Sequence, residues 1–461
     1  MKHSVVIGGG INGIVNAILL AQRGHKVIII ETSAKLGGLY TPVEIDGNWY
    51  DRGLYIPQLT GIDAVDQILL TSCDVTIRSG AEKDIAGNVF KGIHNERSLF
   101  VDTFKLQTNA RERICLEMIE RLRGGTVKIQ PDIDLMGYFT DKFGPYATTH
   151  IFEPISHKIW RKELSSIASL ALKVVHMSRI LLFDEETSRI LKETSAYFDD
   201  RIAFPNQLAI PDKFIQGKTS SFYPRKYGLH NILSGLISKL NALDISVKLN
   251  TKVERIEITQ NHLKGIVVRN GSSLLKLEPD SVIWCAPPEV LHALLGFKKL
   301  PVADSPIPHI THYAICDAPP NTDKLYWSWD FDDNEIIRLS FPSNYCEELN
   351  LRNIHPILIE SHTDGNLEGT KTAEHISNYL SELGIIERRN ILMIHTPKAT
   401  MRWFFVPSVN NIQREEEIIS NIEKKNVNNI YNCAAKISRQ TFYLHDLLSD
   451  GYKQLSTILE A

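Results

Sequence analysis

Three glycines near the start of the chain have the spacing of a dinucleotide-binding site. Gly8, Gly10 and Gly13 form the pattern G-x-G-x-x-G, and Glu31 stands at the end of the next apolar run. Gly8 permits a tight turn, Gly10 lets the backbone approach a pyrophosphate, and Gly13 lets a helix lie against a strand. A carboxylate such as Glu31 accepts hydrogen bonds from ribose hydroxyls and disfavours a 2′-phosphate. The alternative is a glycine-rich turn with a surface glutamate.

The segments around these glycines favour the dinucleotide interpretation. Residues 4–7 are a β-branched run typical of a buried strand, and residues 11–23 carry apolar side chains at helical spacing. Ile11 and Asn12 therefore belong to the first turn of a helix, whose N–H groups would meet the phosphates. Gly24 stands where a helix C-terminal cap belongs, and residues 26–30 read as a second strand. We expect a β-α-β unit of about 30 residues.

The composition is that of a globular protein with more than one folding unit. The chain has 461 residues, of which 43% are hydrophobic and 23% charged, and its formal net charge is -3. There is no excess of positive charge to neutralise nucleic-acid phosphates. The six cysteines form no C-x-x-C pair, which argues against a disulfide framework or a zinc site. Glycines and asparagines interrupt the apolar residues 5–21, so we expect no membrane span there. We also expect a cytoplasmic protein with no nucleic-acid partner and no metal.

The residues after Glu31 resemble those of FAD-binding proteins. The pattern E-x-x-x-K-x-G-G is similar to the flavoprotein continuation that keeps the chain close to the dinucleotide. Residues 50–55 resemble the D-x-G-x-H element that lines the flavin ring in protoporphyrinogen oxidases and UDP-galactopyranose mutases, with Tyr55 in place of the histidine. The resemblance implies FAD contacts from Thr32, Lys35, Gly37, Gly38, Leu39 and Tyr40.

A middle segment continues the resemblance to the protoporphyrinogen oxidase, flavin amine oxidase and UDP-galactopyranose mutase group. Residues 222–228 and a helix at 229–242 precede an N-T-x-V series. In this group the valine gives backbone hydrogen bonds to the adenine. Val253 occupies that position.

The closing segment departs from the pattern of the group. Ala434-Ala435-Lys436 stand where a Gly-Asp or Gly-Arg turn is usual beside the flavin, so a charge-bearing contact is kept there only if Lys436 makes it. Tyr443 and Asp446 are the nearest matches to a Y-x-x-x-D-M element of mutase relatives. Asp446 has the alternative role of an acid favoured by a helix dipole.

Two further segments predict the substrate half. Residues 75–219 carry apolar side chains at helical spacing, which indicates a helical cap whose aromatic residues form its core. Residues 292–395 contain strand-like runs separated by turn residues, which predicts an antiparallel sheet of consecutive hairpins. His309 and His312 would face opposite sides of their strand, which disfavours a metal site.

We therefore expect an α/β fold with a discontinuous, doubly wound Rossmann-like domain that binds FAD. That domain would comprise residues 1–74, 220–291 and 396–461, and the helical cap and the sheet would form a substrate domain.

The resemblance implies an FAD-dependent oxidoreductase of the amine oxidase and protoporphyrinogen oxidase kind. Hydride would pass to flavin N5 from a small-molecule substrate such as a nucleotide sugar or an amine. No catalytic residue can be assigned from the sequence. Candidate substrate contacts are Tyr55, Arg225, Lys226, Trp403, Phe405 and Tyr443, although Arg225 and Lys226 have the alternative of a surface basic pair.

Two other functions stay open. The first is a sugar-nucleotide mutase of the UDP-galactopyranose mutase type, in which N5 of reduced FAD attacks an anomeric carbon. The second is a non-catalytic binding protein with the escort-protein and GDP-dissociation-inhibitor fold. The altered turn Ala434-Ala435-Lys436 makes this second alternative conceivable.

Overall fold

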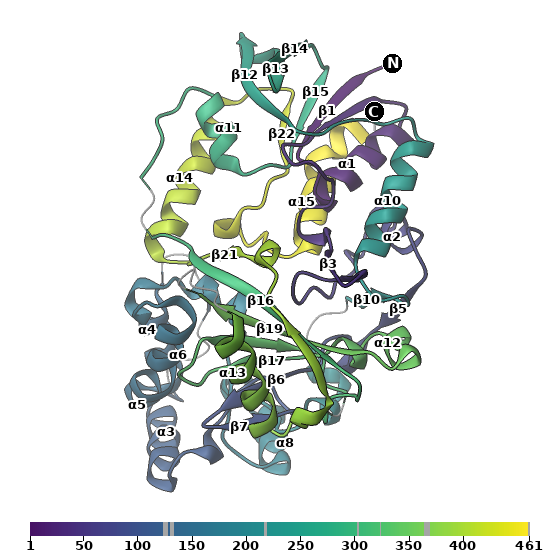
Figure 1. Cartoon of the computed structure of the whole chain (residues 1–461). Helices are drawn as coiled ribbons and strands as arrows, with labels where there is room; N and C mark the ends of the chain where they lie inside the picture. Colours follow the sequence, from purple (N-terminus) through teal and green to yellow (C-terminus); the bar gives the residue numbers. More distant parts are fainter. Residues whose placement is uncertain are drawn as a thin grey trace. The chain divides into compact units, whose positions relative to one another are not determined.

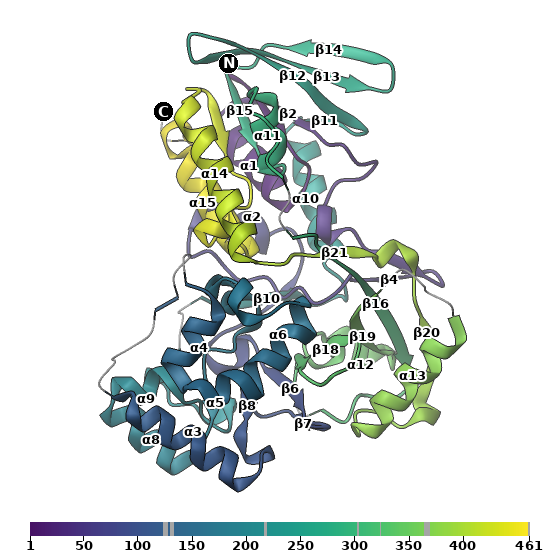
Figure 2. The same cartoon turned by 90° about the vertical axis from the view of Figure 1, so that its left-hand side faces the viewer.

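The computed structural model describes residues 1–122, 128–129, 133–215, 219–301, 304–322, 324–363 and 369–459 (Figures 1 and 2). The chain forms two compact units, and the first unit is assembled from three separated segments. These segments are Met1–Ile77, Thr219–Val302 and Gln413–Ala461, and the second unit is Arg78–Lys218 and Ala303–Ile412. None of the described helices is long and apolar enough to cross a bilayer.

A parallel sheet forms the centre of the first unit. Its order is β11-β2-β1-β15-β22, so the chain leaves β1 on one side for β2 and returns on the other side as β15. The strands are β1 (His3–Ile7), β2 (Lys26–Ile30), β11 (Ser246–Lys248), β15 (Ser281–Trp284) and β22 (Ile430–Asn432). Ligands of such sheets bind beyond the carboxyl ends of the strands, where the strand order reverses.

Helix α1 lies on one face of this sheet, and a small antiparallel sheet with α11 and α14 lies on the other. Val6 faces α1, whereas Val5 and Ile7 join a core cluster that includes residues of β13, α11 and α14. The remaining elements of the unit are α1 (Ile11–Gln22), β3 (Val43–Ile45), β4 (Asn48–Tyr50), α2 (Asp63–Leu70), β5 (Val75–Arg78), β10 (Ser221–Pro224), α10 (His230–Ala242), β12 (Thr251–Thr259), β13 (His262–Asn270), β14 (Ser273–Leu277), α11 (Pro288–Leu294), α14 (Val409–Lys425) and α15 (Leu444–Leu459).

The second unit is a mixed sheet with helices. Its sheet order is β20-β16-β19-β18-β17-β6-β7, and β21 also pairs with β16. The strands of this sheet are β6 (Ala86–Phe90), β7 (Ile93–Asn95), β16 (Ile307–Cys316), β17 (Trp327–Asp330), β18 (Ile336–Ser340), β19 (His355–His362), β20 (Ile391–His395) and β21 (Arg402–Phe404). A separate pair of short strands consists of β8 (Val101–Asp102) and β9 (Ile180–Leu181). The helices are α3 (Thr108–Glu120), α4 (Leu135–Phe143), α5 (Pro145–Ala147), α6 (Glu153–Trp160), α7 (Leu172–Val175), α8 (Glu185–Thr194), α9 (Ala196–Arg201), α12 (Glu347–Arg352) and α13 (Gly369–Glu382).

The sheet differs from a series of consecutive hairpins in two ways. β16 pairs with β19 and not with the next strand, β17. β17 pairs in parallel with β6, which comes from the segment expected to be helical. Residues 396–412 go with the second unit, because β21 in this stretch pairs with β16. Pairing between strands far apart in the chain is invisible to local periodicity, which explains both differences.

Candidate functional site

The turn after β1 needs glycine for two different reasons. Gly8 has φ +108°, a conformation that favours glycine, and its N–H donates to the carbonyl oxygen of Ile30 (2.8 Å). A Cβ atom on Gly13 would come within 1.9 Å of the Gly8 carbonyl oxygen. Because real Cβ atoms do not approach other atoms below 3.0 Å, α1 can pass this close to the turn only with glycine at position 13.

The amino end of α1 is open. Gly10 is the N-cap residue, and no side chain caps the helix there. A Cβ atom on Gly10 would meet nothing within 4 Å among the described residues. The first N–H groups of a helix have no partner inside it, and the positive end of the helix dipole favours an anion. Gly10, Ile11, Asn12 and Gly13 thus form a backbone cradle that fits a phosphate group.

Glu31 lies beside this cradle. Its carboxylate accepts hydrogen bonds from the N–H groups of Gly9 (2.6 Å) and Ser33 (2.7 Å). The hydroxyl of Thr32 donates to the same carboxylate (3.2 Å). These bonds hold an anionic acceptor at the carboxyl end of β2, which is where ribose hydroxyls are bound in dinucleotide folds.

A second glycine turn packs against the first. The N–H of Gly37 donates to the carbonyl oxygen of Gly9 (2.8 Å). Gly37 has φ +112° and Gly38 has φ +56°. A Cβ atom on Gly37 would lie 2.4 Å from Leu233 Cδ2 in α10. Close contact with α10 therefore fixes the second turn next to the first.

The other residues of this stretch have different environments. The side chain of Tyr40 is buried, whereas Lys35 and Leu39 are exposed. Burial raises the pKa of the Tyr40 hydroxyl, and the charge of Asp51 raises it further. The rings of Tyr40 and Tyr55 lie 6.2 Å apart between centroids.

Asp51 is a buried carboxyl group that the sequence did not single out as a site residue. It accepts hydrogen bonds from the Tyr223 hydroxyl (2.5 Å) and from the N–H of Leu229, just before α10 (2.8 Å). Burial raises the pKa of Asp51 to about 6, although the bonds from Tyr223 and Leu229 act in the opposite direction. Asp51 thereby anchors the start of α10, the helix that packs on Gly37.

The closing turn follows β22 at the same sheet edge. Asn12 Nδ2 donates to the carbonyl oxygen of Cys433 (2.7 Å), which ties α1 to this turn. The buried ammonium of Lys436 pairs with Asp450 (2.5 Å) in α15. The charge of Lys436 therefore has a partner in the helix that follows the turn.

Asp446 caps the start of α15. One of its carboxylate oxygens accepts from the N–H groups of Tyr443 (3.1 Å) and Phe442 (3.4 Å). This is the interaction that stabilises an acid in the first turn of a helix. The Tyr443 ring stacks on His445 with 5.7 Å between centroids.

The remaining candidates are spread over both units. Val253 lies in β12 and pairs with Val268 of β13. Arg225 and Lys226 are exposed, and Arg225 forms an ion pair with Asp74 (3.5 Å). Trp403 and Phe405 are 67% and 36% exposed, at β21 in the second unit.

The histidines of β16 have separate surroundings. Nε2 of His309 hydrogen-bonds with Glu360 (3.0 Å), whereas Nδ1 of His312 hydrogen-bonds with Thr396 (2.8 Å). The described residues contain no group of three or more side chains able to hold a metal ion.

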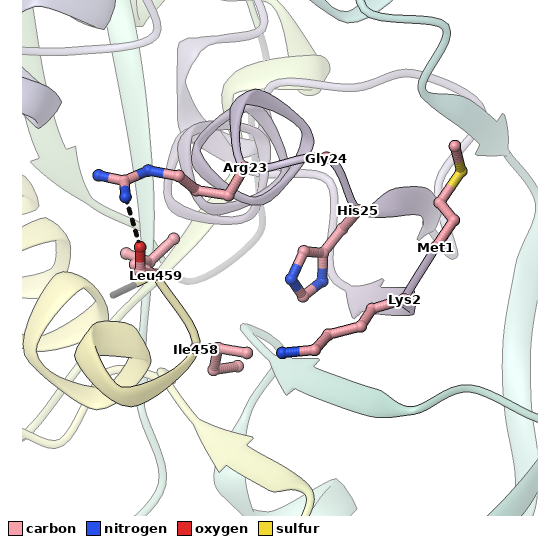
Figure 3. Close-up of a pocket in the computed structure, with 7 residues that line it drawn as sticks. All are labelled: Met1, Lys2, Arg23, Gly24, His25, Ile458 and Leu459. Carbon is pink, nitrogen blue, oxygen red and sulfur yellow. Dashed lines mark hydrogen bonds between the residues drawn. The ribbon is translucent and has the colours of Figure 1, made fainter. Parts of the chain in front are cut away.

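A pocket of about 500 Å³ lies at the opposite end of α1 (Figure 3). Two basic side chains of this pocket form hydrogen bonds within the protein. Arg23 donates to the carbonyl oxygen of Leu459 (2.6 Å), and His25 Nδ1 hydrogen-bonds with Ser4 (2.7 Å). Burial and the charge of Lys2 lower the pKa of His25. Because helix C-termini carry a partial negative charge, Arg23 here stabilises the carboxyl end of α15.

Known proteins resemble this chain in its first residues, over about two thirds of its sequence at low identity, and in its fold. Residues 6–62 match the family described as NAD(P)-binding Rossmann-like domain. A 4,4'-diapophytoene desaturase (4,4'-diapolycopene-forming) of Methylomonas sp is 27% identical over 317 residues, which cover 65% of this chain and 56% of that protein. The 15-cis-phytoene desaturase of Arabidopsis thaliana is 23% identical over 308 residues, or 64% and 50% of the two chains. The chain thus spans about half the length of these relatives.

Solved structures share the whole architecture at low sequence identity. A reduced UDP-galactopyranose mutase has a TM-score of 0.70 at 14% identity, over 100% of this chain and 96% of that one. A putrescine oxidase bound to putrescine has a TM-score of 0.58 at 14% identity, over 100% and 99%. Likeness at this level of identity shows the fold.

Proposed function

Because the chain belongs to the FAD/NAD(P)-binding Rossmann superfamily, we propose that it is an FAD-dependent oxidoreductase that takes hydride from a small-molecule substrate. One observation carries the proposal. The uncapped amino end of α1 faces the open space at Gly10, and Glu31 stands beside it. This arrangement fits a dinucleotide whose diphosphate meets the helix and whose ribose meets the acid.

Each part of the site has a task in this proposal. The N–H groups of Ile11, Asn12 and Gly13 would bind the diphosphate, and Glu31 would accept from the adenosine ribose. The turn at Gly37 and Gly38 and the turn at Lys436 would hold the chain against the cofactor. The backbone of Val253 would bind the adenine. A bound flavin supplies the hydride-accepting chemistry, and the protein supplies orientation and a water-poor environment.

The names of the relatives support the reaction class. The two longest matches described above are desaturases of diapophytoene and of phytoene, which favours the removal of hydrogen from a substrate. An amine or a nucleotide sugar stays among the proposed substrates.

Anaerobic titration tests the proposal. The protein is purified with its own ligand and mixed without oxygen with amines, nucleotide sugars, porphyrinogens and 15-cis-phytoene. We expect one class to bleach the visible flavin bands. A mutase would turn over its substrate under dithionite without net redox change. Turnover of that kind with no bleaching by any substrate would contradict the oxidoreductase.

A further inference from the structure

A row of polar side chains crosses the sheet of the second unit. In the strand register Thr311 lies opposite Glu360, Glu360 opposite Arg338, and Arg338 opposite Trp329. Trp329 in turn lies opposite Asn88. Residues opposite one another in register project from the same face of a sheet, so these five side chains share one face.

Helix α13 packs against the other face (Figure 1). Asp330 follows Trp329 directly and therefore points away from the row. Its carboxylate accepts a hydrogen bond from the hydroxyl of Tyr379 in α13. The polar row is thus on the face that α13 does not occupy.

Two guanidinium groups share one carboxylate at the centre of the row. Nε and Nη2 of Arg338 both donate to Glu360 (2.8 Å each), and Nη2 of Arg402 donates to Glu360 (2.9 Å). Arg402 also donates to the hydroxyl of Thr311 (3.1 Å). The Glu360 side chain is 1% exposed, whereas those of Arg338 and Arg402 are 22% and 14% exposed. The solvent-exposed groups of the cluster are therefore the two guanidinium cations.

Arg338 and Arg402 give the cluster two positive charges, and Glu360 gives it one negative charge. Burial alone would raise the pKa of Glu360, but Arg338, His309 and Arg402 hold it well below its ordinary value. Burial lowers the pKa of His309, which keeps that imidazole neutral. Asp84 is a further carboxyl group that interacts electrostatically with Arg338. Burial raises the pKa of Asp84, and Asp84 Oδ1 accepts a hydrogen bond from Trp327 Nε1 (2.7 Å).

Three buried polar atoms of this face have unused hydrogen-bonding capacity. Among the residues that the structure describes, no hydrogen-bond partner is present for Nε1 of Trp329, Oδ1 of Asn88 or Nδ1 of His309. The three residues are at most 3% exposed. Buried polar atoms are normally paired with protein, water or ligand. A hydrocarbon laid over Arg338 and Arg402 would desolvate their exposed guanidinium groups without offering new polar partners, which is unfavourable.

We propose that Arg338 and Arg402 bind an oxyanion, a carboxylate or a phosphate, on a ligand of the second unit. The inference stands apart from the proposed function, because both arginines lie in the second unit and the cradle at Gly10 lies in the first. Arginine suits this task because its planar fork pairs with oxyanions through two parallel hydrogen bonds. Glu360 holds both guanidinium groups in place through its hydrogen bonds, and its negative charge competes with a bound oxyanion for them.

Calorimetric titration of the full chain with inorganic phosphate and, separately, with succinate tests the inference. We expect saturable binding of at least one probe and at least about a 10-fold loss of affinity in Arg338→Gln and in Arg402→Gln. Arg255→Gln is the matched control, because that side chain is 63% exposed and paired with Glu257, away from the row. If Arg338→Gln does not fold, Arg338→Lys replaces it, with a smaller loss expected because the fork is missing.

Glu360→Gln separates a binding role from a structural one. Removing the competing carboxylate should tighten anion binding several-fold while lowering thermal stability. A purely structural ion cluster would lose stability without any gain in affinity, which would overturn the inference. Absence of saturable binding, or equal affinity in Arg338→Gln and Arg255→Gln, would also overturn it.

The titration does not depend on flavin. A protein that binds phosphate through Arg338 but no FAD would contradict the proposed function alone. A flavoprotein that binds neither probe would contradict this inference alone.

Discussion

The Gly13 Cα and the Gly8 carbonyl oxygen are so close that a Cβ atom on Gly13 would lie 1.9 Å from that oxygen. The same motif leaves Gly10 facing open space. The two glycines therefore have different tasks: Gly13 serves the packing of α1 on β1, and Gly10 serves access to the end of the helix. Substitutions at these positions should separate stability from ligand binding.

Gly13→Ala should destabilise the protein. The new methyl group meets backbone, which cannot rotate away as a side chain can, so α1 has to shift from β1. We expect the free energy of unfolding to fall by about 1–3 kcal/mol. Chemical denaturation followed by circular dichroism measures this, and an unchanged midpoint would contradict the close packing of α1.

Gly10→Ala should leave stability nearly unchanged and weaken FAD binding. Gly10 has φ -72°, which alanine adopts freely, and its Cβ would touch no described residue. The methyl group would occupy the space that the diphosphate needs, so we expect at least about a 10-fold higher Kd for FAD, a loss of the size of one good interaction. Fluorescence titration with FAD gives the value. Affinity equal to that of the unmodified chain would place the diphosphate elsewhere.

Asp51 should make stability depend on pH. Burial raises its pKa to about 6 in the folded protein, so the fold holds the proton more tightly than the unfolded chain does. The stabilisation is complete below the unfolded pKa of about 4 and is lost as the pH rises through about 6. Between about pH 5 and about pH 7 this group should lower the free energy of unfolding by about 1 kcal/mol.

Asp51→Asn tests that dependence. The variant cannot ionise, so its stability should change less over this pH range than that of the unmodified chain. Asp333→Asn, at an exposed carboxylate, is the matched control and should keep the original slope. Parallel pH profiles for Asp51→Asn and the unmodified protein would show that Asp51 does not titrate in this range.

The ion pair of Lys436 and Asp450 should stabilise the closing turn. Asp450→Asn leaves a buried ammonium without its counter-ion, and we expect a loss of about 1–3 kcal/mol. Lys436→Met removes the charge and leaves Asp450, whose side chain is 23% exposed, partly solvated, so the loss should be smaller. Thermal unfolding compares the two. A lower FAD affinity in Lys436→Met than in Asp450→Asn would support a direct contact of Lys436 with the cofactor.

The β-α-β unit could be predicted because its signals are local. Residues 26–30 were expected as a strand and form β2, and the helix expected to begin at Ile11 begins there. The runs in residues 309–361 were expected as strands and form β16, β17, β18 and β19. Alternation and helical spacing within a short window were enough for these elements.

The polar groups of the sheet could not be predicted in the same way. The hydrogen bonds of Glu360 come from residues far away in the sequence: Arg338 is separated from it by 22 positions and Arg402 by 42. Tyr223 and Asp51, which also share a hydrogen bond, are separated by 172 positions. Strand register and burial create these partners, and neither is written in the local sequence. An arginine inside the apolar run IIRLSF was the one signal that pointed to Arg338.

The visible absorption spectrum during titration with FAD tests the central claim most directly. Saturable binding with flavin bands that shift from those of free FAD, weakened at least about 10-fold in Gly10→Ala, is the result that this account predicts. A protein that folds, shows no perturbed flavin bands and retains no FAD after gel filtration would contradict it.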